Sequence, residues 1–369
     1  MRANSPLARL EAYCGKDYLH LVGSGTTGLA LALRTLGIAG APVVVPNNVC
    51  FSVLLAVLSS GNEPLFCDID ENTQGICPDK LKELIGGARA VIAVHNYGIA
   101  CDIRRIKTIC QESGVALIED VSVALGGTSD GVPLGAFGDL SVFSFGAGKL
   151  LNVGHGGLIA TNDSKLRDRM LALAGNLPRY SQDAKQVGDF LSKQHTLYYN
   201  RYFLSEDWER LASYSDLAHN ALQWVEYAFD EEYLPRLTNA LEEIDRLVNL
   251  RLANWGRLKE KIGFLNHDAV TVMECSLGTV PWRLNLLMKA GRNEVLRMFL
   301  GNGEKVSSWH PPLDVFFRQR SVSNICTPKC DEVGNQILNL WINEETDGEY
   351  MERSCSLLEK YLNGEYENG

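Results

Sequence analysis

Short apolar segments alternate with helical ones between residues 18 and 165, and this alternation limits the possible folds more than any other feature. The apolar segments are YLHLV, PVVVP, PLFCDI, AVIAVH, VALIED, DLSVFSF and GLIAT (18–22, 42–46, 64–69, 90–95, 115–120, 139–145 and 157–161). They are rich in Val and Ile and do not alternate polar with apolar residues, as half-exposed strands do. The pattern predicts an α/β fold with a mostly parallel sheet covered by helices on both faces.

The helical stretches between these strands are expected near residues 26–36, 50–60, 78–86 and 102–113. From about residue 166 the chain is helix-rich and charged, and one long helix is predicted over RLTNALEEIDRLVNLRLANWGRLKEKI (236–262). Residues 265–369 mix the strands AVTVMEC and WRLNLLM with two helices. We expect a large domain over 1–245, with a helical insert at about 166–230, and a smaller α+β domain over 246–369.

Composition excludes several classes of protein. Hydrophobic residues make up 46% of the chain and charged residues 22%, a globular balance with ample material for a core. A net charge of −10 without a long basic run argues against nucleic acid as a partner. No apolar run reaches the ~18 residues of a membrane span. The sequence lacks a secretory signal, and its ten cysteines are irregularly spaced, so we expect a cytoplasmic protein with reduced thiols and no metal site.

The segment GSGTTG (23–28) follows a predicted strand and opens a predicted helix, which satisfies the G-x-G-x-x-G pattern of dinucleotide-binding sites. That pattern also requires an acidic residue ~20 positions later, where this chain has VVVPNN. A turn with Gly25, Thr26 and Thr27 at a helix N-terminus can instead bind a single phosphate. It can equally be a tight, threonine-capped turn, and the segment alone leaves these two interpretations open.

A single lysine, Lys149, lies between two glycine clusters in FSFGAGKLLNVGHGG (143–157). An amine that is partly desolvated has a lowered pKa and reacts with carbonyl groups. Asp120 ends the strand VALIED, and Ser144 lies five residues before Lys149. Each of them alone could be a helix cap or a buried hydroxyl. Together, a reactive lysine, a carboxylate and a phosphate-binding turn are the groups that pyridoxal phosphate requires.

Five segments, in this order, resemble the DegT/DnrJ/EryC1/StrS family. They are GSGTTGLALALRTLGI, VVVPNNVCFSVLLAVLSSGNEPLFCDID, AVIAVHNYGIACDI, ALIEDVSVALGG and GAFGDLSVFSFGAGKLLNVGHGGLIATND, which together cover roughly residues 20–165. Beyond them the resemblance is thinner and rests on YLPRLTNALEEIDRL and SSWHPPL. The family consists of fold-type-I enzymes that use pyridoxal phosphate, mostly aminotransferases acting on nucleotide-linked keto sugars. It implies a homodimer in which each subunit completes the other's active site.

The resemblance also implies roles for individual residues. Lys149 is the lysine that would bind the cofactor's aldehyde, and Asp120 would pair with the pyridine nitrogen. The other expected cofactor-binding residues are Gly25, Thr26, Thr27 and Ser144 around the phosphate, Ser122 under the ring, and Cys50 and Phe51 near the ring. His310, Arg236 and His95 are tentative substrate contacts; the alternatives are a satisfied core histidine at 95 and an ordinary surface or interface arginine at 236.

Five positions depart from the family pattern. Cys50 stands where relatives have a stacking aromatic residue, and Val123 where a glutamine or histidine approaches the cofactor's phenolic oxygen. Gly146 replaces a histidine, and Leu150 replaces an asparagine beside the lysine. Leu234 replaces the asparagine that reaches the neighbouring subunit's phosphate in relatives. Each change removes a polar contact, so we expect the substrate, the cofactor affinity, or both, to be unusual.

The function predicted from the sequence is transfer of an amino group from glutamate, which leaves as 2-oxoglutarate, to a nucleotide-linked keto sugar, as in amino-sugar and polysaccharide biosynthesis. One alternative is an enzyme of the same family acting on a cyclitol or another keto substrate. The other is a non-catalytic relative that kept the fold. Some sugar dehydratases of the family carry histidine in place of the lysine, so Lys149 argues against that chemistry.

Overall fold

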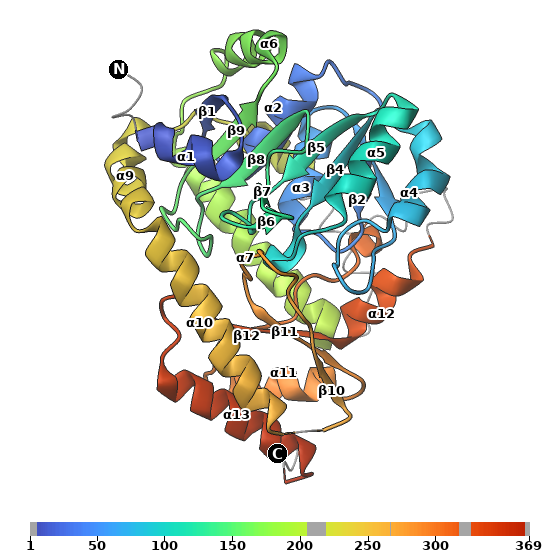
Figure 1. The fold of residues 1–369 in the computed structure, drawn as a ribbon, viewed down its shortest axis with the longest axis vertical. Coiled ribbons are helices and arrows are strands. Elements are labelled where there is room, and N and C mark those ends of the chain that lie inside the picture. The colour runs from blue at the N-terminus through green and yellow to red at the C-terminus, as the bar shows by residue number, and fades with distance from the viewer. Residues whose placement is uncertain (1–5, 205–218, 266, 317–325, 366–369) are drawn as a thin grey trace.

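The computed structural model describes residues 6–204, 219–265, 267–316 and 326–365, which form two sheets surrounded by helices (Figure 1). The larger sheet has the strand order β1-β9-β8-β5-β4-β2-β3. Its strands are β1 (Tyr18–Val22), β2 (Pro42–Pro46), β3 (Glu63–Cys67), β4 (Ala90–Val94), β5 (Ala116–Asp120), β8 (Leu140–Ser144) and β9 (Gly157–Thr161). All neighbours are parallel except β9, which is antiparallel to β8 and to β1. The expected α/β class with a mostly parallel sheet is confirmed.

Helices cover the two faces of this sheet and form a separate apolar cluster on each. The helices α2 (Gly25–Thr35), α3 (Phe51–Ser59) and α6 (Ser164–Ala174) contribute to one cluster, and α1 (Pro6–Cys14), α4 (Pro78–Leu84) and α5 (Ile103–Ser113) to the other. Successive strand residues point to opposite faces, so Val43 and Val45 belong to the first cluster and Val44 to the second. This two-sided burial is why the strands are apolar without alternation.

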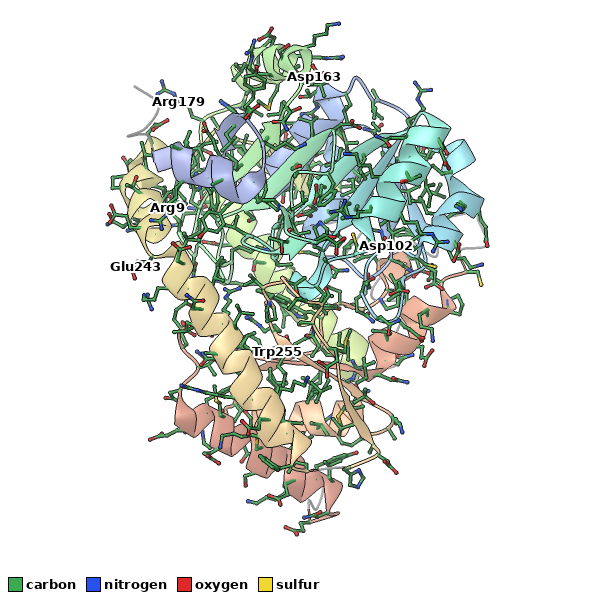
Figure 2. The ribbon with its side chains drawn as sticks, viewed as in Figure 1. Arg9, Asp102, Asp163, Arg179, Glu243 and Trp255 are labelled. Carbon is green, nitrogen blue, oxygen red and sulfur yellow. The ribbon has the colours of Figure 1, made fainter. Side chains whose placement is uncertain are left out.

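The helical region after β9 differs from the prediction. The helix α7 (Gln182–Leu204) follows α6, and the single helix expected over 236–262 is wrong, because the chain forms α9 (Leu234–Glu242) and α10 (Ile244–Gly263) instead. At Glu243 the backbone N–H bonds the carbonyl of Ala240, three residues back, at 3.2 Å. This bond spans three residues, as in a 3₁₀ turn, instead of the four of an α-helix. It marks the junction between α9 and α10 at Glu243, which Figure 2 labels.

The smaller sheet is antiparallel with the order β10-β11-β13-β12. Its strands are β10 (Val270–Val272), β11 (Leu284–Met288), β12 (Val306–Ser307) and β13 (Ile337–Leu340), and its helices are α11 (Arg292–Gly301), α12 (Pro328–Gln336) and α13 (Gly348–Leu362). The sequence predicted two helices here, and the described part of this region has three. The short pieces elsewhere are the hairpin of β6 (Thr128–Ser129) and β7 (Val132–Pro133) and five 3₁₀ turns, η1 (Ile85–Gly87), η2 (Asn96–Gly98), η3 (Leu222–Trp224), η4 (Glu231–Tyr233) and η5 (Leu313–Phe316).

Buried polar side chains at the ends of β2 and β3 attach the smaller sheet's region to the larger sheet. The side-chain amide of Asn47 donates to Asp314 Oδ1 at 2.7 Å, and its oxygen accepts the N–H of Asp314 at 2.9 Å. The carboxylate of Asp68 accepts the N–H groups of Lys329 (3.1 Å) and Cys330 (2.9 Å). Asp68 therefore caps the N-terminus of α12 from a distant part of the chain, where a negative charge is favourable.

We predict that Asp68→Ala lowers the free energy of unfolding by about 2 kcal/mol, because it leaves buried N–H groups unpaired. Urea unfolding followed by circular dichroism measures this loss. Asp163→Ala is the matched control, since Asp163 (Figure 2) also accepts two N–H groups, but as an exposed cap of its own helix, α6. A loss for Asp68→Ala no larger than for the control would show that this contact does not hold the two regions together.

Candidate active site

The carboxyl ends of β5 and β8 bring two of the predicted residues to one edge of the sheet. Asp120 is the last residue of β5 and Ser144 the last of β8, and these strands are parallel neighbours. At the same edge β1 ends at Val22 and leads through a short turn into α2. Ligands of open α/β sheets bind outside these carboxyl ends, and the loop with Lys149 leaves β8 at this edge.

Two side chains from distant segments hold the backbone of the Lys149 loop. The indole Nε1 of Trp282 donates to the carbonyl of Gly148 at 2.8 Å, and Nη2 of Arg251 donates to the carbonyl of Lys149 at 2.9 Å. Gly148 has φ +76°, in the left-handed region that favours glycine, and a Cβ there would meet open space. The glycine therefore serves the turn, and the space beside it is left free.

The environment of Lys149 favours its neutral form. Burial lowers the pKa of the Lys149 amine below its ordinary value. The nearby Cys50 and Asp120 oppose this change, while the positive charges of Arg283 and Arg251 add to it. The carboxylate of Asp120 is itself 4% exposed and accepts the N–H of Ser122 at 2.9 Å. A neutral amine close to a buried carboxylate can attack a carbonyl group at moderate pH.

A cavity of ≈ 340 Å³ contains Lys149 and residues from both regions of the chain. The described residues that line it include the sequence candidates Thr26, Cys50, Phe51 and His310, and Ser24 beside Gly25. The others include the aromatic residues Trp224, Tyr227, Trp282 and Trp309 and one side of α7, with Ala184, Val187, Gly188, Leu191 and Ser192. The sequence analysis did not single out these residues individually, because residues far apart in the chain form the wall.

The N-terminus of α2 forms a narrow cradle. The Oγ of Ser24 accepts the N–H of Thr27 at 3.0 Å and caps the helix. A Cβ at Gly25 would lie 3.1 Å from Cβ of Ser144 and 3.2 Å from Oγ of Ser122. These distances are tighter than ordinary contacts, so glycine is favoured at position 25. The helix cap that the sequence offered as one interpretation is present, and binding of an anion at the same turn stays a prediction.

The hydroxyl of Thr27 is paired within the protein. The side chain is fully buried, and its Oγ1 donates to the carbonyl of Val225 and accepts the N–H of Tyr227, both at 3.3 Å. Thr27 thus fixes the segment that carries Trp224 and Tyr227 into the cavity wall. Its backbone N–H is bound by Ser24 Oγ, and a contact of Thr27 with a phosphate stays a prediction.

The three tentative substrate residues have different positions. His310 lines the cavity, and its backbone N–H donates to the hydroxyl of Tyr97 at 2.9 Å. His95 is fully buried, accepts the N–H of Cys101 at Nδ1 and therefore donates from Nε2 to Glu119 at 3.0 Å. His95 is thus a satisfied core histidine.

Arg236 is exposed on α9, and its guanidinium lies 5.4 Å from the ring centroid of Tyr233. It is not among the described residues that line the cavity of its own chain. Within one chain the structure therefore does not bring Arg236 to Lys149, and a contact of Arg236 with the substrate in the partner subunit's site stays a prediction.

The structure shows the surroundings of three positions that depart from the family pattern, 50, 123 and 150. Phe51 is 1% exposed and touches the cavity beside Cys50, whose thiol donates to Ser52 Oγ at 3.4 Å. Leu150 is buried in the apolar core, and Val123 packs against a cluster that includes Trp282. The polar contacts that the family pattern expects at 123 and 150 are thus replaced by apolar packing.

The residues present fit pyridoxal phosphate. The cradle at Gly25 is small enough that a single Cβ would fill it, and it lies next to the hydroxyls of Ser144 and Ser122. The lysine amine and the carboxylate of Asp120 are close enough to change the pKa of the amine. Among the described residues no group of three His, Cys, Asp or Glu side chains could hold a metal ion, and no helix is long and apolar enough to cross a bilayer.

Comparison with known proteins shows what the chain is similar to. Residues 7–190 match the family model of the DegT/DnrJ/EryC1/StrS aminotransferase family. The chain is 37% identical over 154 residues to GDP-perosamine synthase of Vibrio cholerae, covering 41% of this chain and 42% of that protein. It is 35% identical over 160 residues to L-glutamine:2-deoxy-scyllo-inosose aminotransferase of Streptomyces fradiae, covering 43% of this chain and 38% of that protein. The matches span less than half the length of these relatives.

The fold itself is shared with solved structures. NtdA of Bacillus subtilis with bound cofactor PMP superposes with a TM-score of 0.74 at 20% identity, covering 98% of this chain and 78% of that one. At this level of identity the likeness shows the fold alone.

We predict that Lys149 reacts with aldehydes at a lower pH than an ordinary lysine. Trace reductive methylation between pH 6 and 10, read by mass spectrometry, gives the pH of half-maximal labelling for each amine. Lys80 is the control, because its hydrogen bond with Glu83 raises its pKa. Since only the neutral amine reacts, the midpoint for Lys149 should lie below that for Lys80. Identical midpoints would contradict the lowered pKa.

Proposed function

Residues 7–190 belong to the DegT/DnrJ/EryC1/StrS aminotransferase family, and from this membership we propose that the protein is an aminotransferase that uses pyridoxal phosphate. It moves the amino group of glutamate to the ketone of a nucleotide-linked sugar and releases 2-oxoglutarate. The observation that carries the proposal is the buried amine of Lys149, with lowered pKa, beside Asp120 and the cradle of α2.

Each residue has a defined task in this proposal. Pyridoxal phosphate, when bound, supplies a carbonyl group and an electron-accepting ring. The first turn of α2, with Ser24 and Thr26, would hold the phosphate, and Asp120 would hold a proton on the ring nitrogen. The neutral amine of Lys149 would hold the cofactor's carbonyl group and would accept the proton from the donor's Cα. The aromatic wall of Trp282 and Trp309 excludes water from that proton.

A second acceptor class is favoured by the lining of the cavity. Among the described lining residues Lys149 is the only lysine or arginine, its amine favours the neutral form, and most of the others are apolar or aromatic. A diphosphate linker needs cations from outside this lining, which in the proposed homodimer the partner subunit would supply. An uncharged cyclic ketone, such as a cyclitol, needs none. The acceptor is therefore tested with both classes.

We predict that the purified protein with added pyridoxal phosphate converts glutamate to 2-oxoglutarate in a single turnover, seen as a change in the cofactor's visible absorption. Lys149→Ala should slow this half-reaction by roughly 10²–10⁴-fold, the usual contribution of a positioned acid–base group. Asp120→Asn keeps the shape but removes the charge that holds the ring proton, so it should also be slow. Lys80→Ala and Asp163→Asn are matched surface controls expected to react as wild type.

Adding an acceptor ketone to the product of this half-reaction identifies the second substrate. Restoration of the original absorption by a nucleotide-linked keto sugar supports the leading proposal, and restoration by a cyclitol ketone alone supports the second class. A protein that binds no cofactor and leaves glutamate unchanged would favour the non-catalytic alternative.

A further inference from the structure

Two buried arginines lie behind the Lys149 loop with several nitrogens unpaired. Arg251 is 1% exposed and Arg283 is 4% exposed. Nη2 of Arg251 donates to the carbonyl of Lys149, and Nη1 of Arg283 donates to the carbonyl of Trp282. Nε and Nη1 of Arg251 and Nε of Arg283 are buried and have no hydrogen-bond partner among the described residues. Buried polar groups of this kind are rare and need an explanation.

No carboxylate of the described residues forms an ion pair with either guanidinium. Glu344 and Glu345 act on them only from a distance, and both are exposed; Glu345 pairs instead with Lys305. Burial lowers the pKa of Arg251 to about 10, and burial together with the charge of Arg251 lowers that of Arg283 to about 9. Two buried like charges without a counter-charge are costly, and a bound anion would remove that cost.

The two guanidinium groups contact residues of the cavity that contains Lys149, although neither arginine is among the described residues that line it. Trp282 lines the cavity, and the guanidinium of Arg283 stacks 4.1 Å from the centroid of its indole ring. On its other side Arg283 lies 4.0 Å from the ring centroid of Trp341. Both arginines are close enough to Lys149 to lower the pKa of its amine. An anion bound to them would therefore lie beside the reacting group.

We propose that Arg251 and Arg283 form an oxyanion-binding site and that it takes the carboxylate of the amino donor. The assignment rests on the proposed function, because transamination is the reaction that brings an amino acid to Lys149. A donor whose nitrogen meets the cofactor at Lys149 carries its α-carboxylate only two bonds from that nitrogen. The unpaired nitrogens of Arg251 and Arg283 are the unsatisfied donors beside the Lys149 loop, which Arg251 contacts directly, and they would receive it.

The geometry favours a carboxylate over a phosphate. A guanidinium offers a planar fork of N–H groups that matches the two oxygens of a carboxylate. Here each fork has one or two unpaired nitrogens, and Arg283 is enclosed between two indole rings. A diphosphate is larger, carries more charge and needs more donors than this enclosed pair provides. Both anions share the same chemistry of recognition, so the experiment includes both.

Binding of 2-oxoglutarate to the full chain tests the proposal without any turnover. Isothermal titration and thermal melting are recorded with 2-oxoglutarate, with inorganic pyrophosphate and with chloride at equal ionic strength. We expect 2-oxoglutarate to bind and to raise the melting temperature, and Arg283→Gln to weaken that binding roughly tenfold or more. Arg246→Gln is the matched control, since Arg246 is an exposed arginine of the same helix as Arg251 and pairs with Glu243.

Arg283→Met provides a second variant that keeps the volume and removes the buried charge. Without ligand it should melt no lower than wild type, because the charge is costly to bury, and it should not respond to 2-oxoglutarate. Unchanged 2-oxoglutarate binding in both Arg283 variants, or no binding to wild type, overturns the site. Binding of pyrophosphate but not of 2-oxoglutarate through Arg283 overturns the carboxylate assignment. Because no step of catalysis is measured, these results are independent of whether the proposed transamination occurs.

Discussion

The chemistry of the site depends on the burial of the Lys149 amine. Lys149 lies in a loop at the carboxyl edge of a parallel sheet, where desolvation lowers its pKa, and Asp120 is the nearby carboxylate that opposes this change. The two come together because β5 and β8 are parallel neighbours that end at the same edge. The N-terminus of α2 completes the site with N–H groups suited to an anion. A buried amine, a carboxylate and a helix N-terminus are thus brought together by one strand order.

The smaller sheet's region contributes Trp282, Trp309 and His310 to the cavity wall. Trp282 bonds the carbonyl of Gly148, and His310 is fixed by the hydroxyl of Tyr97. Behind them, Asp68 caps α12 across the two regions. These contacts are buried and fully paired, so they place the aromatic wall at a fixed position relative to Lys149. The unpaired nitrogens of Arg251 and Arg283 stand out against this background of satisfied groups.

The sequence predicted the parts of the molecule that depend on local pattern. Strands buried on both faces are continuous apolar runs, so all seven strands of the larger sheet were found to within two residues at each end. The cavity wall was not predicted, because Trp282 meets Gly148 across 134 positions of the chain. Arg251 looks like any other charged residue of an amphipathic helix until its burial is known. Thr27 matches a phosphate-binding pattern, but its hydroxyl bonds a segment near residue 225.

The central claim is that Lys149 is the residue that binds the cofactor's carbonyl group. Borohydride reduction of the protein with pyridoxal phosphate, followed by peptide mapping, tests it most directly, because reduction fixes the cofactor to whichever amine holds it. If Lys149 holds the cofactor, we expect a single pyridoxyl group on the peptide that contains Lys149. A pyridoxyl group on another lysine, with Lys149 unmodified, would contradict it.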